Sequence, residues 1–188
     1  MTKKRKKIGR RRMNNSSSYP IDLDFIATES ADRVLENEQF RRFLGTYIGN
    51  LDAIVQELNL QISAKVDCTA CGNCCRSLMI NVTRQEANQL ADRLGCSFSA
   101  LKETHLEESM GGQLIINTIP CHFLKDNKCT VYEDRFAECR EFPGLHRNGF
   151  RDRIFSTLMH YGRCPIVYHL IEELKGITNF TVQNKEHA

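Results

Sequence analysis

The sequence VDCTACGNCCRS, residues 66–77, holds four closely spaced cysteines, Cys68, Cys71, Cys74 and Cys75. Two residues between successive cysteines let a tight turn bring both sulfurs to one metal ion, with backbone N–H groups facing the thiolates. Gly72 can take a left-handed conformation in this turn without steric cost. So dense a run of cysteine does not fit a regular amphipathic element, and we predict a loop that binds metal.

The adjacent pair Cys74-Cys75 bears on the number of metal centres. In extended backbone neighbouring side chains point to opposite faces, so one sulfur joins Cys68 and Cys71 while the other needs partners elsewhere. The second half of the chain offers four more cysteines. Eight cysteines divide into two four-sulfur sites, the number that saturates zinc or an iron–sulfur cluster; one site with spare thiols is the alternative. The predicted ligands are Cys68, Cys71, Cys74, Cys75, Cys121, Cys129, Cys139 and Cys164.

The ninth cysteine, Cys96, follows Gly95 at the end of a predicted helix and has no other cysteine close in sequence. Cysteine is among the residue types most often buried, so we interpret Cys96 as a packing residue. An odd total of nine also fits poorly with a complete set of disulfides. Clustered cysteines in a reducing compartment indicate metal binding or catalysis instead.

The N-terminus is basic, but no apolar region follows it as in a secretory signal. No apolar run approaches the roughly 20 residues that span a bilayer. We therefore predict a cytoplasmic protein without a membrane span. Residues 1–18 hold eight of the 26 Lys and Arg and no acid, which leaves residues 19–188 with 18 basic against 23 acidic side chains, net −5.

We predict that residues 1–18 form a disordered basic tail. Clustered Lys and Arg release counterions from phosphates, so this tail is a candidate contact for nucleic acid or another acidic surface. It contains no aromatic residue on which a base could stack, and a solvated tail without a specific partner is the alternative.

Beyond the tail, the pattern predicts three segments: an N-terminal helical segment over 19–65, a cysteine-cluster metal-binding domain over 66–178, and a C-terminal tail over 179–188. Within 21–62, apolar residues recur at intervals of three and four, and Gly45 and Gly49 indicate a break between two helices. The apolar face comprises Leu35, Phe40, Phe43, Leu44, Tyr47, Ile48, Leu51, Ile54, Val55 and Leu58.

Capping and turn signals place the elements of the second segment. Thr83 and Glu86 form a capping box for a helix that Gly95 ends, and Ser97 or Ser99 caps a short helix after it. QLIINT (113–118) has the composition of a strand, and PCHFLKDNKCTVY (120–132) reads as a hairpin around a polar turn. EDRFAECREF (133–142) suits a short helix, and Pro165 opens a last helix that Gly176 ends. The fold class is α+β: mostly helical, with a short β-hairpin and cysteine-rich loops around one or two metal centres.

Four segments closely resemble the YkgJ-like cysteine-cluster proteins: CTACGNCC (68–75), PCHFLKDNKCTVY, DRFAECREFP (134–143) and RCP (163–165). The resemblance covers about Val66 to Tyr168 and implies a zinc- or iron-chelating domain. It maps family positions onto the same eight cysteines and leaves Cys96 outside. Arg135-Phe136 stands where the family has Arg-Pro, a departure that removes a rigid turn residue but no ligand.

Charged and imidazole side chains near the cysteines have weaker assignments. Arg135 and Arg140, and less strongly Arg76, are candidates to offset the negative charge of thiolate-bound metal, and solvated surface charges are the alternative. The histidines lack the spacing of a zinc pair and are predicted not to be ligands, with His146 and His160 the nearest to an exception.

The sequence supports three hypotheses about function. The first is a non-enzymatic module that binds iron–sulfur or zinc, with iron–sulfur favoured by the C-x2-C-x2-C run. The second is an iron–sulfur-dependent oxidoreductase or protein methylase, since flagellin lysine methylases carry a similar cysteine set. The third is an interaction protein with structural zinc and a nucleic-acid-binding basic tail.

Overall fold

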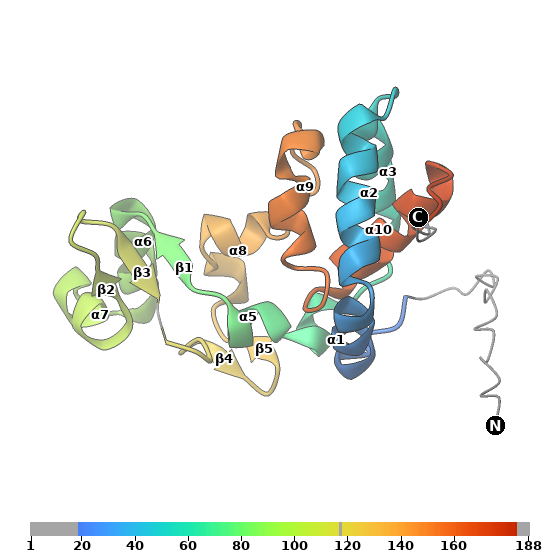
Figure 1. Ribbon diagram of the computed structural model, residues 1–188. Helices are drawn as coiled ribbons and strands as arrows, with labels where there is room; N and C mark the ends of the chain where they lie inside the picture. Colours follow the sequence, from blue (N-terminus) through green and yellow to red (C-terminus); the bar gives the residue numbers. More distant parts are fainter. Residues whose placement is uncertain (1–18, 117, 184–188) are drawn as a thin grey trace.

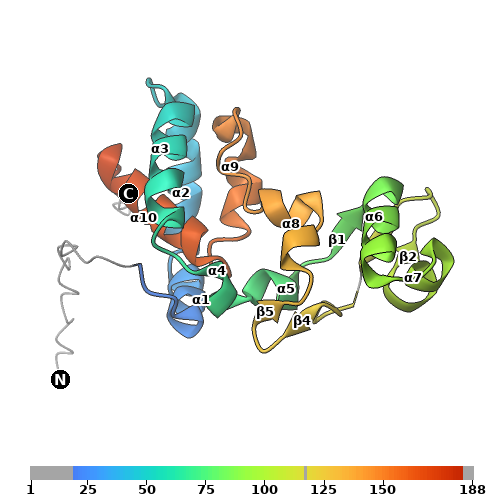
Figure 2. The same ribbon diagram turned by 180° about the vertical axis from the view of Figure 1, so that it is seen from behind.

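The computed structural model describes residues 19–116 and 118–183, so the predicted tail over 1–18 and the end of the predicted C-terminal tail lie outside the described residues. The chain is mostly helical with small antiparallel strand pairs, which confirms the predicted fold class. Its elements form two groups at opposite ends of an elongated molecule, with shorter elements between them (Figure 1, Figure 2). Over the described ranges, no helix has the length and apolar character that crossing a bilayer requires.

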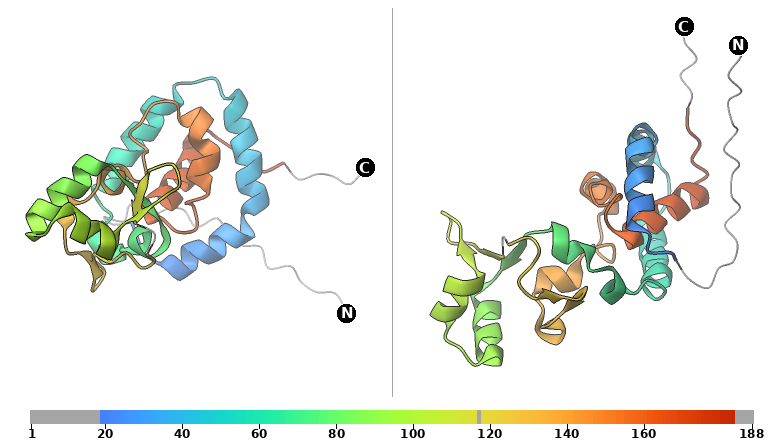
Figure 3. Two further views of the ribbon diagram at one scale, coloured as in Figure 1. Left: turned by 90° about the vertical axis from the view of Figure 1, so that its left-hand side faces the viewer. Right: turned by 90° about the horizontal axis from the view of Figure 1, so that it is seen from below.

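The first group, here the helical lobe, is formed by helices from the beginning and the end of the described chain, which lie together in Figure 3. Its core is formed by buried apolar residues from both ends of the described chain, including Phe40, Leu44, Val55, Phe150 and Leu170. The predicted boundary at residue 65 stays a prediction, but this core draws on both sides of it. The five helices are α1 (Leu23–Asp32), α2 (Val34–Thr46), α3 (Leu51–Ser63), α9 (Phe150–Leu158) and α10 (Pro165–Ile177).

The predicted helical segment therefore consists of three helices rather than two. The break after α2 falls between Gly45 and Leu51 as predicted, and a second break occurs at Arg33. Most of the predicted apolar face packs into the core, but Leu35 is 78% exposed and Ile48, in the loop after α2, is 98% exposed. Leu35 lies five residues before Phe40, off the buried face of α2, and Ile48 lies beyond the end of this helix, so the interval pattern was wrong for both.

The second group, here the sheet lobe, packs two helices and a three-stranded sheet around a separate small core. The capping box of Thr83 and Glu86 opens α6, Ser97 caps α7, and Gly95 ends α6 with φ +68°, all as predicted. The sheet order is β1-β3-β2, and its outer strands were not foreseen because each is only two or three residues long. The bounds are β1 (Ile80–Val82), α6 (Arg84–Leu94), α7 (Phe98–His105), β2 (Glu107–Glu108) and β3 (Leu114–Ile116).

Short elements connect the two lobes. The predicted hairpin is present, with Leu124 opposite Cys129 and a turn whose central residues, Asp126 and Asn127, both have positive φ. Phe123 from the hairpin and Phe136 before α8 are buried in the sheet-lobe core. The connecting elements are α4 (Cys68–Cys71), α5 (Asn73–Ser77), β4 (Leu124–Lys125), β5 (Lys128–Cys129), the 3-10 helix η1 (Tyr132–Asp134) and α8 (Ala137–Glu141).

One long-range contact fixes α9 in the helical lobe. The carboxylate of Asp52 on α3 accepts hydrogen bonds from the backbone N–H groups of Gly149 (2.9 Å) and Phe150 (2.8 Å) at the start of α9. These two bonds hold the pKa of Asp52 below its ordinary value of 3.8. Asp52 thus caps a helix from nearly 100 residues away, because Gly149 itself has no side chain to do so.

We predict that Asp52→Ala lowers the free energy of unfolding by about 1 kcal/mol at neutral pH, the usual cost of losing a helix cap. Because folding depresses the pKa of this carboxyl, its contribution is present above the unfolded-state pKa and is lost as pH falls through the folded-state value. Urea unfolding from pH 7 to pH 3 should therefore show the difference between the two chains shrinking below about pH 4. Asp52→Asn, which keeps an acceptor without a charge, should show a smaller deficit at neutral pH; a pH-independent deficit for Asp52→Ala would contradict this account.

Candidate metal centre

All eight cysteines predicted as ligands line one cavity of about 330 Å³ between the two lobes. Cys96 does not line it; this residue lies beyond the end of α6 and is exposed, so the prediction that it is buried was wrong. Its position after the left-handed Gly95 directs the chain outward, which the sequence alone did not indicate. Every cysteine of the chain is a free thiol.

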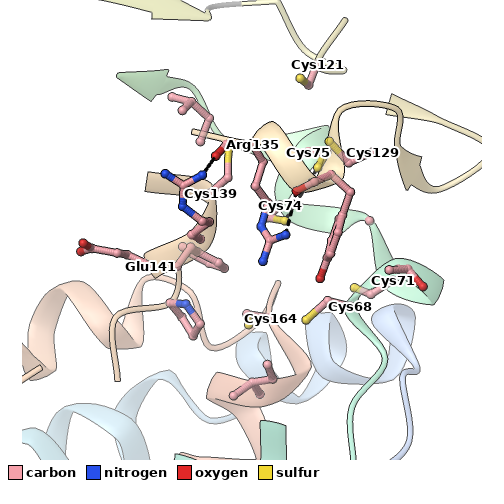
Figure 4. A pocket seen from close by; sticks show the side chains of 18 of the residues that line it. Cys68, Cys71, Cys74, Cys75, Cys121, Cys129, Arg135, Cys139, Glu141 and Cys164 are labelled. Atoms are coloured by element: carbon pink, nitrogen blue, oxygen red, sulfur yellow. Dashed lines mark hydrogen bonds between the residues drawn. The ribbon is translucent and has the colours of Figure 1, made fainter. Parts of the chain in front are cut away.

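Seven of the eight sulfurs fall on two sides of the cavity (Figure 4). Cys68, Cys71 and Cys164 lie on the side of the helical lobe, whereas Cys75, Cys121, Cys129 and Cys139 lie toward the sheet lobe. Cys74 lies between the two groups. Each lobe thus contributes one set of cysteine thiols to the cavity, and the thiol of Cys74 lies between the two sets.

The CxxCxxCC stretch is not the loop that we predicted but two short helices, α4 and α5, joined at Gly72. Gly72 has φ +58°, as predicted, and a Cβ there would lie 2.9 Å from the carbonyl oxygen of Asn127. The sulfurs of Cys74 and Cys75 are 4.0 Å apart within α5. The premise of an extended backbone with opposed side chains was therefore wrong, because successive side chains on a helix diverge less than those on a strand.

The hairpin is attached directly to this stretch. The backbone N–H of Cys121 donates to the carbonyl oxygen of Cys75 at 2.8 Å. Arg76 donates both to the carbonyl oxygen of Cys71 and to the side-chain oxygen of Asn127 in the hairpin turn. These bonds place Cys121 and Cys129 beside the vicinal pair, so the arrangement depends on contacts between segments about 50 residues apart.

Two glutamates position α8, which carries Cys139. Glu86 of the capping box also accepts a hydrogen bond from the backbone N–H of Ala137, the first residue of α8. Glu138 accepts from both the backbone and the side-chain amide of Asn81 on β1, at 2.8 and 2.7 Å. Capping-box residues are recognisable in a sequence, but this second role of Glu86 is not, because its partner lies 51 residues away.

Cys164 occupies the cap position of α10, followed by Pro165 in the first turn as predicted. Backbone N–H groups of Ile166 and Val167 point at its sulfur. The residue before it is held by Asn73 of α5, whose side-chain amide donates to the carbonyl oxygen of Arg163 at 2.8 Å. Cys164 thereby comes to the same wall of the cavity as α4.

Burial opposes ionisation of most of these thiols. It raises the pKa of Cys139 and of Cys164 to about 12, and it also raises the pKa values of Cys68, Cys71 and Cys121. Cys74 is the exception, because a hydrogen bond from the Cys75 thiol lowers its pKa to about 6, while the pKa of Cys75 rises. Without a cation among them, the thiols whose pKa is raised therefore stay protonated at neutral pH.

Two of the predicted cationic residues, Arg135 and Arg76, act on the thiols through their charge. The guanidinium of Arg135 stacks on the ring of Tyr132, 3.9 Å from the centroid, and its positive charge favours the thiolate of Cys68. Arg76 acts similarly on Cys71 and Cys74. Arg140 lines the cavity but donates to the carbonyl oxygen of Arg135. Tyr132, which sequence reasoning missed, gives the Arg135 side chain its support.

The histidines are placed differently from one another. His146 lines the cavity, whereas His160 packs edge-on against Phe142, and burial lowers its pKa. His105 and His122 contact each other through their rings. Among the described residues, the cavity therefore presents one imidazole, that of His146, beside eight thiols, and the absence of histidine ligands stays a prediction.

The donor set fits an iron–sulfur cluster or zinc, since both take four thiolates. Among the described residues, however, no three His, Cys, Asp or Glu side chains are gathered closely enough to hold a single metal ion. Four sulfurs bound to one zinc at about 2.3 Å would lie roughly 3.8 Å from one another. The sulfurs of Cys74 and Cys75 are close to this spacing at 4.0 Å, but no third metal-binding side chain among the described residues joins them.

A small, mostly helical α+β chain with a cavity lined by cysteines defines a cysteine-cluster metal-binding protein. The chain belongs to the CxxCxxCC family, described as a "putative zinc- or iron-chelating domain", whose family model matches residues 67–161. Searches of curated proteins and of solved structures find no match to the chain.

Loss of the Glu86 carboxylate should loosen α8. We predict that Glu86→Ala lowers the free energy of unfolding by about 2 kcal/mol, because it removes the bonds to Thr83 and leaves the Ala137 N–H without its partner. Hydrogen exchange of the α8 amides should accelerate as well. Glu103→Ala, at an exposed position on α7, is the control and should leave both unchanged; a variant in which only α6 loosens would show that Glu86 does not position α8.

Proposed function

We propose that this protein is a non-enzymatic chelating module in which eight cysteines hold iron as iron–sulfur clusters. The observation that carries the proposal is the cavity itself: it brings together eight thiols from α4, α5, the hairpin, α8 and the start of α10, and it leaves out Cys96. Chance packing of free thiols would not select eight of nine from five separate elements. The bound metal would then stabilise the fold, or be sensed, buffered or delivered.

The spacing of the sulfurs supports iron–sulfur over zinc. A cluster of several iron and sulfide atoms sets its cysteine ligands farther apart than one zinc ion does, and the described cysteines surround about 330 Å³ without any three converging on one point. An iron–sulfur cluster would supply one-electron redox chemistry, whereas a zinc ion closed by four thiolates would supply structural cross-linking.

The number of thiols supports chelation over catalysis. Eight thiolates saturate two sites of four ligands, and a closed four-ligand site has no open position for a substrate. The guanidinium groups of Arg76 and Arg135 are engaged with backbone carbonyl oxygens and with Tyr132, where they offset thiolate charge. The polar groups nearest the sulfurs thus support the thiols.

Metal analysis after anaerobic purification tests the proposal directly. We expect a brown protein with iron and acid-labile sulfide, and a visible absorption spectrum that bleaches on reduction. A colourless protein with stoichiometric zinc would contradict the iron–sulfur assignment but keep the chelating role. A chain that retains neither metal under these conditions would overturn both.

Cys71→Ser should lose at least half of the bound metal and destabilise the connecting elements, because metal-binding energy at such sites is folding energy. Cys96→Ser is the matched control and should bind as much metal as the unaltered chain, since Cys96 is exposed and outside the cavity. Metal content per chain and the thermal unfolding midpoint measure both effects. Loss of metal in Cys96→Ser would show that the ligand set is misassigned.

A further inference from the structure

The two lobes have separate hydrophobic cores, and the cysteines divide between them. Cys164 is buried in the helical-lobe core, whereas Cys121, Cys129 and Cys139 pack against the sheet-lobe core. Within residues 19–116 and 118–183, no buried residue belongs to both cores. Each lobe therefore positions its own set of cysteines, and the position of one set relative to the other depends on the connecting elements.

The first set of thiols, those of Cys68, Cys71 and Cys164, is attached to the helical lobe through the residues on both sides of α4 and α5. Val66, two residues before Cys68, is buried in the helical-lobe core. On the other side, the bond from Asn73 to the carbonyl oxygen of Arg163 joins α5 to the residue before Cys164. Figure 4 shows Cys68, Cys71 and Cys164 on the same side of the cavity. Cys74, between the two sides, is the fourth thiol available to this group.

The second set of thiols, those of Cys75, Cys121, Cys129 and Cys139, is attached to the sheet lobe. The bond from the Cys121 N–H to the Cys75 carbonyl oxygen joins the hairpin to α5, and strand pairing places Cys129 opposite Leu124. Cys139 follows Glu138, which is bonded to Asn81 on β1. Cys75, Cys121, Cys129 and Cys139 thus make a second set of four.

We infer that the chain holds two distinct metal centres, one ligated by Cys68, Cys71, Cys74 and Cys164 and the other by Cys75, Cys121, Cys129 and Cys139. This inference rests on the proposed function. The first centre fastens α4 and α5 to the start of α10, and the second fastens α5 to the hairpin and α8. Because Cys74 and Cys75 are consecutive, the peptide bond between them joins a ligand of one centre to a ligand of the other.

This division has a mechanical consequence. The cores of the described residues are separate, so the sulfur–metal bonds on either side of the Cys74-Cys75 peptide add cross-links that apolar packing between the lobes does not supply. Loading of both centres joins the lobes into one body. Emptying one centre releases the elements that it fastens and leaves the other lobe and its centre in place.

Two single variants test the division. Cys164→Ser should lose about half of the metal and increase hydrogen exchange at the start of α10, with α8 and the hairpin unchanged. Cys139→Ser should also lose about half of the metal but open α8 and the hairpin, with α10 unchanged. Cys96→Ser again serves as the control. Loss of all metal in either variant, or opening of the same segments in both, would overturn the division.

Native mass spectrometry of the unaltered full chain gives a second test that does not depend on how the variants fold. Stepwise removal of metal with a chelator should pass through a half-loaded species that persists over a range of chelator concentrations. A direct transition from the fully loaded to the metal-free chain would overturn the division while leaving the proposed function intact. A chain that carries no metal at the outset would overturn the proposed function and the division with it.

Discussion

The convergence of eight thiols on one cavity is the constraint on which the rest of the molecule depends. Burial disfavours thiolates, and neighbouring thiolates repel one another, so the arrangement is unfavourable until positive charge is placed among the sulfurs. Arg76 and Arg135 supply part of that charge. The local structure around each cysteine serves to hold this otherwise repulsive set in place.

Small hydrophobic cores explain why such cross-links matter here. The sheet lobe is built on nine buried residues, and its strands are two or three residues long. Cores of this size supply little net stability, and small domains commonly depend on metals or disulfides in addition. In this chain eight cysteines line the cavity between the two lobes, so the proposed metal centres would add cross-links that neither core supplies.

Local signals in the sequence were reliable where the interaction itself is local. The capping box of Thr83 and Glu86, the hairpin turn at Asp126-Asn127 and the first-turn Pro165 are each determined within a few residues, and each is present. Signals that assumed a regular backbone over longer stretches failed. Leu35 lies off the buried face of α2, and Ile48 lies in the loop after that helix. The vicinal pair Cys74-Cys75 is helical rather than extended.

The sequence by itself determined which cysteines belong together, because their spacing and the family pattern single out the eight that line the cavity and omit Cys96. Only the tertiary structure decided how they are grouped. Cys164 comes to Cys68 through the packing of α10 on α3, and Cys139 comes to Cys121 through Glu86 and Glu138. These contacts join residues 50 to 100 positions apart in the sequence. Contacts between residues so far apart produce no periodicity or motif spacing from which they could be predicted.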